Sequence, residues 1–573
     1  MDDPAQKRQM SQDIKSAIKS QTRSRRDAHS SRHQSARFLV TLQADYHGGD
    51  GDGADGEPDG QSREPGSLLM GDGQGGVASD PLSTFPASHS DEHARPRMPR
   101  QYRTDRSFSE SSVGLLGGEE EAWDFECAMI YIDHVFPFLF PFYRPSLGET
   151  SRAWLLPFMR MNKTIQHLVK SLSSFFIACG LRAVSSGEEE PFHSDAWEEV
   201  EVRLQECLQM LQLEIRVDND GENVDNTILK KAQLMETIIH VMVFDRFVGT
   251  NTTWSVYLDT ALDLFKSITD AVVPESTERN DLVSSILDAE CFESRQTTPG
   301  YEHQLYSPSQ TAFAFFMAWL IYIDIISSTS LRRAPMLEMF HSSILGDAKP
   351  GKTYPLDLSS FVGCPNWIAR ILSDIASLAA RKKAMEIEGS VDRLDLTLRF
   401  VRIFGAIAPG LEAVEANAKE SMNRDHTLPW WLQSSHRSAA HNASQSLEIT
   451  RIWAHALQVY LRVIHTGFDP TNSEIMYHAN NAIQGLQRLP DVEILRALAW
   501  PICVVGCLAE TREDRGNIEL IIHRVRDAVP RSPADEAGRI IEEVWRLREL
   551  SAIDHSWDVA SCLNVLDMPP LLI

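Results

Sequence analysis

Cysteine is scarce in this sequence, and its scarcity excludes two kinds of site. Only eight cysteines occur among 573 residues, and the first is Cys127. From there to Cys562 they stand mostly alone, whereas a disulfide framework favours short chains with dense, even spacing. Residues 1–126 also cannot supply thiolate ligands for a zinc cluster. We therefore expect most of these thiols to be buried as small apolar groups.

Long hydrophobic runs and an excess of positive charge are also lacking. The longest apolar run, Ala312–Ile323, falls short of the roughly 20 residues that a membrane-spanning helix needs, so we expect no such helix. The first 30 residues hold no apolar stretch typical of a signal peptide. The 80 acidic residues outnumber the 55 lysines and arginines, giving a net charge of -25. Most of the folded protein should therefore repel a phosphate backbone, and any nucleic-acid contact must come from a small basic element.

Residues 1–120 are predicted to be disordered. The first 40 residues hold nine lysines or arginines against four aspartates. Gly48–Gly76, rich in glycine and aspartate, is predicted to be a flexible linker because it has too few apolar groups to offset the entropy of ordering. The densest basic cluster is formed by Lys19, Arg23, Arg25 and Arg26. A nuclear-import signal is the favoured interpretation of this cluster, and weak, unspecific phosphate contact is the alternative.

Residues 121–573 are predicted to form an all-helical domain. Apolar residues recur there at spacings of three and four, and alternating runs of strand length are almost absent. No fixed period links the segments, which favours a large irregular helical bundle or array over a regular solenoid. Heptads typical of a dimerising coiled coil are not evident after the linker. The clearest helical segments are Ile165–Leu181, Trp197–Leu213, Thr227–Val248, Ala312–Ser327, Ile368–Ile387, Ser446–Thr466, Ile475–Leu489, Val492–Glu510 and Asp535–Leu550.

Gly346–Thr353 fits the spacing of a phosphate-binding P-loop, G-x-x-x-x-G-K-[ST]. Such a loop joins a buried strand to a helix. Here Met336–Leu345 is predicted to be helical, and Pro355 follows where the next helix should begin. A surface loop is the favoured interpretation, and a nucleotide-binding enzyme is an unlikely alternative.

Asn280–Asp288 resembles the magnesium-binding N-D-x-x-S-x-x-x-E motif of terpene synthases. An enzyme of that class needs a second acidic cluster on a facing helix to hold several Mg²⁺ ions. The nearest acidic cluster, Asp218–Glu222, lies in a stretch rich in glycine and asparagine. Asn280 or Asp281 is therefore expected to cap a short helix. We predict no catalytic residue, no metal site and no cofactor.

Cys503 and Cys507 lie four residues apart on a predicted helix and therefore share one face. Two thiolates are too few for a closed zinc site, and a disulfide across one helical turn has poor geometry. We expect both thiols to be buried by packing. Gly506 between them should allow close approach of another helix. His134, His240 and His455 are likewise expected to be core or interface residues.

Six segments of the predicted domain resemble the fungal-specific transcription factor domain, the regulatory part of fungal zinc-cluster transcription factors, and among them the acriflavine-sensitivity regulators. They are Tyr131–Ser146 (YIDHVFPFLFPFYRPS), Phe315–Asp324 (FFMAWLIYID), Trp453–Arg462 (WAHALQVYLR), Trp500–Ala509 (WPICVVGCLA), Val544–Arg546 and Trp557. The first contains Phe136, Phe138, Phe140 and Phe142, for which core packing is the favoured role and an aromatic groove for a partner or effector is the alternative.

The resemblance implies a transcription regulator in the nucleus, with a helical domain that senses an effector or binds partners, in a fungal metabolic or resistance pathway or gene cluster. Zinc and sequence-specific DNA binding are not carried over, because residues 1–126 lack the family's six-cysteine cluster. A regulator without its own DNA-binding element and a coding segment missing before Met1 both stay open as explanations. The expected partners are other transcription proteins or a DNA-binding protein, and a small-molecule effector whose contact residues the sequence does not identify. A non-transcriptional helical scaffold is the alternative function.

Overall fold

Helices make up nearly all the regular structure of the chain, and no strand occurs in the described residues. The computed structural model describes residues 117–573 except 144, 146–151, 186–192, 218–223, 250–253, 273–281, 290–291, 293–305, 347–355, 423–429, 529–530, 551–552 and 554–556. The predicted all-helical fold is confirmed for these residues. Residues 1–116 of the predicted disordered region, with the basic cluster and the linker, lie outside them, whereas residues 117–120 form the start of a helix.

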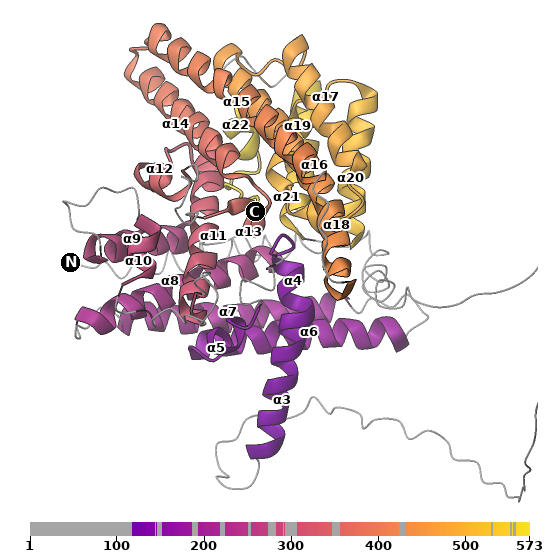
Figure 1. Cartoon of the computed structure of the whole chain (residues 1–573). Helices are drawn as coiled ribbons and strands as arrows, with labels where there is room; N and C mark the ends of the chain where they lie inside the picture. The colour runs from indigo at the N-terminus through magenta and orange to yellow at the C-terminus, as the bar shows by residue number, and fades with distance from the viewer. Residues whose placement is uncertain are drawn as a thin grey trace, which may run out of the picture. The chain divides into compact units, whose positions relative to one another are not determined.

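The elements follow one another along the chain as shown in Figure 1. They are α3 (Gly117–Ile130), the π-helix η2 (Tyr131–Val135), α4 (Phe136–Leu139), α5 (Leu155–Met159), α6 (Lys163–Ser185), α7 (His193–Val217), α8 (Val224–Val248), α9 (Trp254–Val272), α10 (Leu282–Leu287), α11 (Pro308–Leu331), the 3-10 helix η5 (Glu338–Phe340), α12 (His341–Ile344), α13 (Leu358–Val362), α14 (Asn366–Glu388), α15 (Arg393–Met422), α16 (Trp430–Thr466), α17 (Ser473–Arg488), α18 (Val492–Arg496), α19 (Ala499–Cys507), α20 (Arg512–Ala528), α21 (Pro533–Glu549) and α22 (Val559–Leu563).

Helix α11 lies at the centre of the fold and packs against α5, α8, α9, α13, α14 and α22. A capping box between Ser307 and Gln310 starts it, with Pro308 at its first position. It is long and apolar enough to cross a membrane, but 89% of its most apolar stretch is buried inside the protein. A helix that is apolar on all sides is expected in just such a core position.

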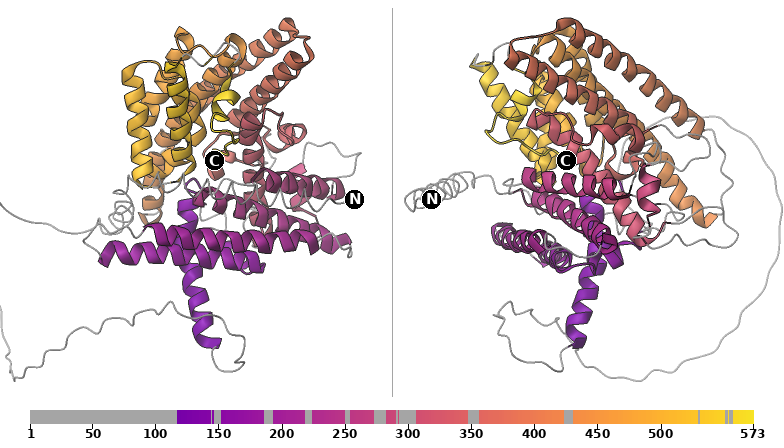
Figure 2. Two further views of the ribbon diagram at one scale, coloured as in Figure 1. Left: turned by 180° about the vertical axis from the view of Figure 1, so that it is seen from behind. Right: turned by 90° about the vertical axis from the view of Figure 1, so that its left-hand side faces the viewer.

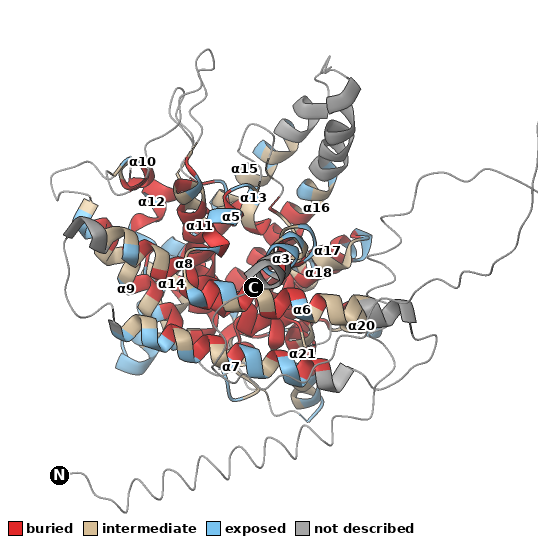
Figure 3. Ribbon diagram, turned by 90° about the horizontal axis from the view of Figure 1, so that it is seen from below, coloured by how far each residue is buried: buried red, intermediate tan, exposed pale blue. Residues whose placement is uncertain are grey.

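Two groups of helices meet around α11. In the first, α6 contacts α7, α7 contacts α8, and α8 contacts α9. In the second, α19 is surrounded by α16, α17, α20, α21 and α22. Figure 2 shows the two groups from two further sides, and Figure 3 shows that buried residues line the interior of both.

The C-terminal tail after α22 joins the two groups. Its backbone carbonyls accept hydrogen bonds from Trp254 Nε1 at Pro569 (3.2 Å), Ser330 Oγ at Pro570 (2.9 Å) and Arg246 Nε at Leu571 (3.1 Å). Leu571 and Leu572 are fully buried. The tail is therefore part of the core, since it satisfies buried donors on α8, α9 and α11.

The predicted helix Val492–Glu510 is wrong as a single element. The structure divides it into α18 and α19, with a break at Ala497 and Leu498. Pro501 explains the break, because a proline in the interior of one continuous helix would clash with the preceding turn. In the observed arrangement Pro501 lies in the first turn of α19, where its missing N–H needs no partner.

Three long helices, α9, α15 and α20, were not among the segments predicted from the sequence. Helix α15 was missed because Gly405, Pro409 and Gly410, all poor helix formers, interrupt the apolar periodicity in the middle of the helix. Gly410 is needed there, because a Cβ at this position would lie 2.6 Å from the Trp367 ring of α14.

Candidate functional site

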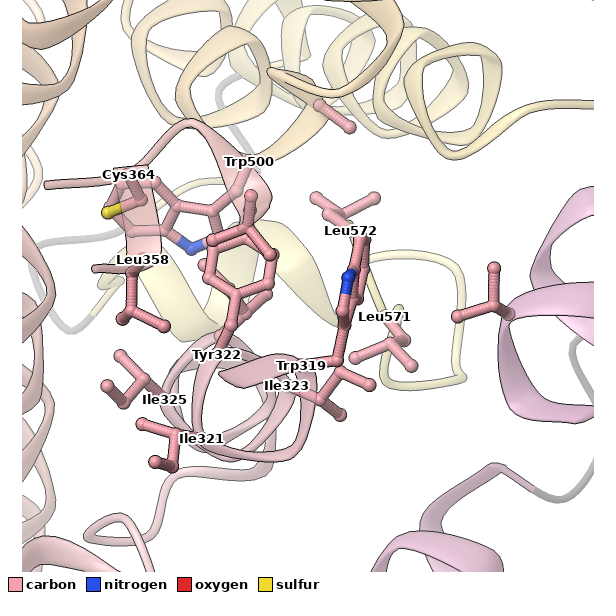
Figure 4. Close-up of a cluster of buried hydrophobic side chains, with 14 of the residues drawn as sticks. Trp319, Ile321, Tyr322, Ile323, Ile325, Leu358, Cys364, Trp500, Leu571 and Leu572 are labelled. Carbon is pink, nitrogen blue, oxygen red and sulfur yellow. The ribbon is translucent and has the colours of Figure 1, made fainter. Parts of the chain in front are cut away.

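A small cavity lies where the segment after α4 meets α8, α11, α18 and the C-terminal tail. Its volume is about 30 Å³, enough for about two water molecules. Figure 4 shows Trp319 and Tyr322 projecting from α11 on this side of the core, with Leu571 and Leu572 of the tail near Trp319. The lining residues are Leu139, Pro141, Phe142, Val243, Arg246, Phe247, Trp319, Tyr322, Val362, Arg496, Ala497, Pro533 and Ile573.

Arg496, the last residue of α18, carries a buried positive charge to the cavity wall. Its side chain donates a hydrogen bond through Nη2 to the Phe138 carbonyl, and its guanidinium lies 4.4 Å from the centre of the Phe138 ring. Its Nε is buried without a hydrogen-bond partner, and none of the described carboxylates forms an ion pair with it. Burial lowers the pKa of Arg496 to about 10, against the attraction of Glu493. A buried charge left so incompletely paired costs free energy.

Trp319 of α11 supplies a second unsatisfied donor to the same cavity. Its indole Nε1 is buried and has no hydrogen-bond partner in the described structure. The ring is fixed by packing, with its centre 5.1 Å from that of Phe140 and 6.0 Å from that of Tyr322. Buried indole N–H groups usually find an acceptor. Arg496 and Trp319 thus each add one buried donor without a partner to the residues that line the cavity.

Arg246 also reaches the cavity, but its charge is already balanced. Its Nη2 donates to Glu536 on α21 in an ion pair in which both side chains are almost fully buried. Its Nε donates to the tail carbonyl of Leu571. Arg246 therefore serves as a structural link between α8, α21 and the tail, whereas Arg496 retains a charge that an occupant can neutralise.

One wall of the cavity is formed by Phe142, which packs on the backbone of Gly363. A Cβ at Gly363 would lie 2.4 Å from the Phe142 ring, and the Gly363 φ of +70° favours glycine as well. Gly363 is therefore required for Phe142 to close the cavity on this side. Phe136, Phe138 and Phe140 are buried in the core, as predicted, while Phe142 is half-buried and belongs to the cavity.

The chemistry of the cavity favours an acceptor with negative charge. A cation, an indole donor and an apolar wall of Leu139, Val243 and Phe247 surround a space of carboxylate size. Ligand sites in proteins commonly combine an apolar lining with a few such polar groups. No group of three or more His, Cys, Asp or Glu side chains that could hold a metal ion occurs among the described residues.

Cys503 and Cys507 are buried, as predicted, but a third cysteine lies with them. Cys562 of α22 packs against α19, and Phe468, Val559 and Leu563 surround the three thiols. Burial raises the pKa of the Cys503 and Cys562 thiols. Cys562 was not predicted to join the pair, because 55 residues separate it from Cys507. Gly506 is in its expected role, since a Cβ there would lie 2.4 Å from Ile541 Cδ1.

The three histidines predicted to lie in the core or at an interface do not all do so. His134 is exposed, so its predicted core position is wrong. His240 is fully buried and forms a 2.5 Å hydrogen bond with the Tyr131 hydroxyl. His455 lies between α16 and α17, with its Nδ1 2.9 Å from Nδ1 of His478.

The remaining candidate motifs fall largely outside the described residues. Lys19, Arg23, Arg25 and Arg26 are all outside them, as are Asp218–Glu222 and Asn280. In the P-loop-like stretch only Gly346 is described, and it follows the short helix α12 where a P-loop would follow a strand. Asp288 lies just after α10.

Of the cavity residues, only Phe142 belonged to a site considered from the sequence, as part of the alternative aromatic groove. The signal that was present is a single arginine, Arg496, inside the apolar run Ile494–Trp500. A lone charge in such a run predicts either a buried ion pair or a ligand contact. Trp319 carries no comparable signal, because one more aromatic residue on an apolar helix is ordinary.

Comparison with known proteins places the chain among fungal regulators. The fungal specific transcription factor domain matches residues 126–573. The transcription factor dibT of Pestalotiopsis microspora is 30% identical over 454 residues, covering 78% of this chain and 70% of that protein. The pestheic acid cluster transcriptional regulator 3 of Pestalotiopsis fici is 24% identical over 77% of this chain and 72% of its own length. A trichothecene biosynthesis transcription regulator of Trichoderma arundinaceum is 23% identical over 74% of this chain and 91% of its own length. No solved structure matches.

Proposed function

Since the chain belongs to the fungal specific transcription factor domain family and is a transcription regulator rather than an enzyme, we propose that its helical domain senses a small anionic effector in the cavity of Arg496 and Trp319. The observation that supports this proposal is the pair of buried donors without acceptors at one cavity. Both nitrogen atoms are closed off from the cavity, so a carboxylate would accept from them after a shift of the two side chains, and it would then neutralise the Arg496 charge.

The position of the cavity suggests how an effector would act on the domain. Its lining comes from α8 and α11 on one side and from α18 and the tail on the other. An anion bound at Arg496 would add an attraction between these parts and stabilise one arrangement of the two helix groups. A ligand changes a conformational equilibrium only through such a difference in affinity.

The relatives suggest what the regulator controls. One is named for the pestheic acid cluster and another for trichothecene biosynthesis. We propose by analogy that this chain acts in the nucleus on a biosynthetic gene cluster, together with other transcription proteins or a DNA-binding partner. The predicted import signal at Lys19, Arg23, Arg25 and Arg26 remains part of this proposal. Loss of nuclear accumulation of a fluorescent fusion after changing all four residues to Ala would support the import role, and unchanged accumulation would contradict it.

Effector binding can be tested with sodium acetate and sodium benzoate as probes on the full chain. Acetate is close in size to the space of about two water molecules, and benzoate tests whether the cavity opens to admit an aromatic ring. We expect saturable binding by calorimetry, lost in Arg496→Met and weakened in Trp319→Phe. A panel of larger carboxylic acids then measures what the rest of the site accepts.

Arg462→Met is the matched control, because Arg462 is also buried but bonds Glu474 on α17, away from the cavity. If Arg462→Met abolishes binding as strongly as Arg496→Met, or if neither probe binds, the proposed site is wrong. A reporter driven by a regulated promoter gives the functional readout. Arg496→Met should remove its response to the effector while the protein level stays constant.

A further inference from the structure

Helix α15 presents an apolar stripe to solvent on the side that faces away from α14 and α16. Leu394, Leu398 and Val401 are 69%, 63% and 59% exposed. The opposite side of the helix is anchored, because Ile403 and Ile407 are buried and the Phe400 ring stacks on His465 at 4.2 Å. Figure 1 shows α14 and α15 as a hairpin whose tip lies away from α6 and α7. The stripe is therefore an outward face of a firmly packed helix.

The stripe has the spacing of a short coiled-coil seam, although no dimerising heptads were predicted from the sequence. Leu394, Leu398, Val401, Gly405 and Ala408 follow one another at intervals of four, three, four and three, and all are exposed. This alternation keeps one narrow line of residues facing a partner helix. The side chains are large at the N-terminal end of the seam and small at the other end. A solvated helix has no need of a seam with this gradient.

Gly405 is the residue that argues most directly for a partner. A glycine in a helix interior costs about 0.5–1 kcal/mol relative to alanine. Within the chain nothing requires it, since a Cβ at Gly405 would meet no atom within 4 Å and its φ is not positive. Gly410, five residues later, is required by the Trp367 ring. Gly405 is explained if another chain approaches the helix closely at this point.

We propose that the seam of α15, Leu394 to Ala408, binds the same seam of a second copy of this chain in antiparallel orientation. In that orientation the end of each seam with large side chains packs against the end of the other seam with small side chains. Leu394 lies opposite the second copy's Gly405, and Leu398 lies opposite its Val401. A two-fold interface requires such self-complementarity, and a parallel pair would instead leave Gly405 opposite Gly405.

The charges beside the seam agree with the antiparallel arrangement. Asp395 and Arg402 flank the seam on the same side, one heptad apart. Antiparallel pairing brings Asp395 of one copy near Arg402 of the other, twice by symmetry. Arg402 is exposed and its charge acts on Asp374 of α14 without a direct ion pair, while Asp395 already bonds Arg381 and Arg399. Parallel pairing would place like charges at equal heights.

Sedimentation analysis of the full chain over a wide concentration range tests the proposal. We expect a reversible monomer–dimer equilibrium. Leu398→Glu should weaken the dimer by at least about tenfold, since it would bury two carboxylates near the two-fold axis. Gly405→Leu should weaken it comparably by filling the space for the second copy's Leu394. Arg402→Glu should weaken it by a few fold.

Gly405→Leu is the decisive variant, because it replaces a poor helix former with a good one in open space and should leave the fold intact or improve it. Leu520→Glu on α20 is the matched control, since Leu520 is also exposed, at 58%. It should leave the dimer unchanged. A mixture of Leu394→Cys and Gly405→Cys chains should cross-link on oxidation more efficiently than either variant alone.

A chain that stays monomeric at all concentrations would overturn the proposal. Cross-links from the seam to residues 1–116 of such a monomer would assign the face to that segment. A dimer that is insensitive to Leu398→Glu and Gly405→Leu would place the interface elsewhere. Cross-linking of Leu398→Cys with itself, without the mixed 394–405 product, would show a parallel pair. Effector binding at Arg496 is independent of each of these outcomes.

Discussion

Helices α11 and α15 are both long, yet they use their apolar residues in opposite ways. In α11 the residues from Phe315 to Ser330 are buried without exception, and helices or the tail cover the helix on every side. In α15 only one side is covered, and its apolar residues continue around to the solvent face. The difference indicates that α11 completes its contacts within the chain, whereas α15 leaves contacts for another molecule.

The polar groups of the two helices also differ, since those near α11 are buried and those on α15 are exposed. The core around α11 contains buried polar groups. Asp324 accepts hydrogen bonds from within the chain, whereas Trp319 Nε1 has no hydrogen-bond partner among the described residues. On α15 the polar groups form exposed ion pairs, such as that of Asp395 with Arg381. Substitutions should therefore be costly on α11 and mild on α15, except where α15 meets a partner.

The largest difference is expected between two aspartates. Asp324 of α11 is fully buried and accepts hydrogen bonds from the backbone N–H groups of Met336 (3.1 Å) and Leu337 (2.8 Å). Asp324→Ala would leave both donors unsatisfied, at about 1–3 kcal/mol each. We therefore expect a loss of about 2–4 kcal/mol in the free energy of unfolding at pH 7, measured by urea denaturation.

Asp324→Asn should lose less than Asp324→Ala, because the amide oxygen still accepts from one of the two donors. Asp395→Ala on α15 is the comparison, and its exposed ion pairs should leave stability nearly unchanged. Equal losses of unfolding free energy in Asp324→Ala and Asp395→Ala would contradict the proposed difference between α11 and α15.

A second prediction concerns Gly506 of α19, the core counterpart of Gly405. A Cβ at Gly506 would lie 2.4 Å from Ile541 Cδ1 and 3.0 Å from Ile541 Cγ1. The side chain of Ile541 must then move within a packed core, so Gly506→Ala should cost about 1–3 kcal/mol despite the better helix propensity of alanine. Ile541→Val in the same chain should recover part of that loss. Thermal denaturation of the single and double variants measures both effects.

A third prediction uses pH to probe the core beside α11. His240 of α8 is buried between the Tyr131 hydroxyl and the Phe158 and Phe316 rings, and burial lowers its pKa to about 3. Between pH 6.5 and 3, His240 is therefore protonated in the unfolded chain but neutral in the folded chain. Stability should fall as the pH decreases from 6.5 toward 3, by about 1.4 kcal/mol per pH unit from this residue.

His240→Gln should reduce the pH slope of the unfolding free energy by one proton, because its amide can still bond Tyr131 but does not titrate. His134→Gln is the control, since His134 is exposed. An unchanged slope in His240→Gln would contradict the lowered pKa of His240.

The sequence predicted the helices that have a clear apolar face or an apolar interior, and it failed where other residues obscured the pattern. In α11 the nearly unbroken apolar run that includes Phe313 and Phe316 is enough to predict a buried helix. In α15 Gly405, Pro409 and Gly410 hide an equally regular helix, and of these Gly410 is explained by its contact with the Trp367 ring rather than by local propensity. The helix predicted around Pro501 is two helices in the structure, because proline is tolerated in the first turn of a helix but not in its interior.

The cavity could not be predicted, since it depends on contacts between distant segments. Phe138 and Arg496 are 358 residues apart and yet share a hydrogen bond. Ser330 and Pro570 are 240 residues apart and bring the tail against α11. Composition and spacing describe the faces of each helix, but which faces meet depends on the whole packing of the domain.

The smallest expected effect is the most informative about α15. Gly405→Ala adds a methyl group in open space, so the free energy of unfolding of the monomer should rise by about 0.5–1 kcal/mol. The same methyl group occupies the position opposite the second copy's Leu394, so self-association should weaken by a few fold. Denaturation at a concentration below the dimerisation range and sedimentation above it measure the two quantities separately. A fall in monomer stability would mean that the space at Gly405 is already filled, and stronger association would mean that the seams do not approach closely there.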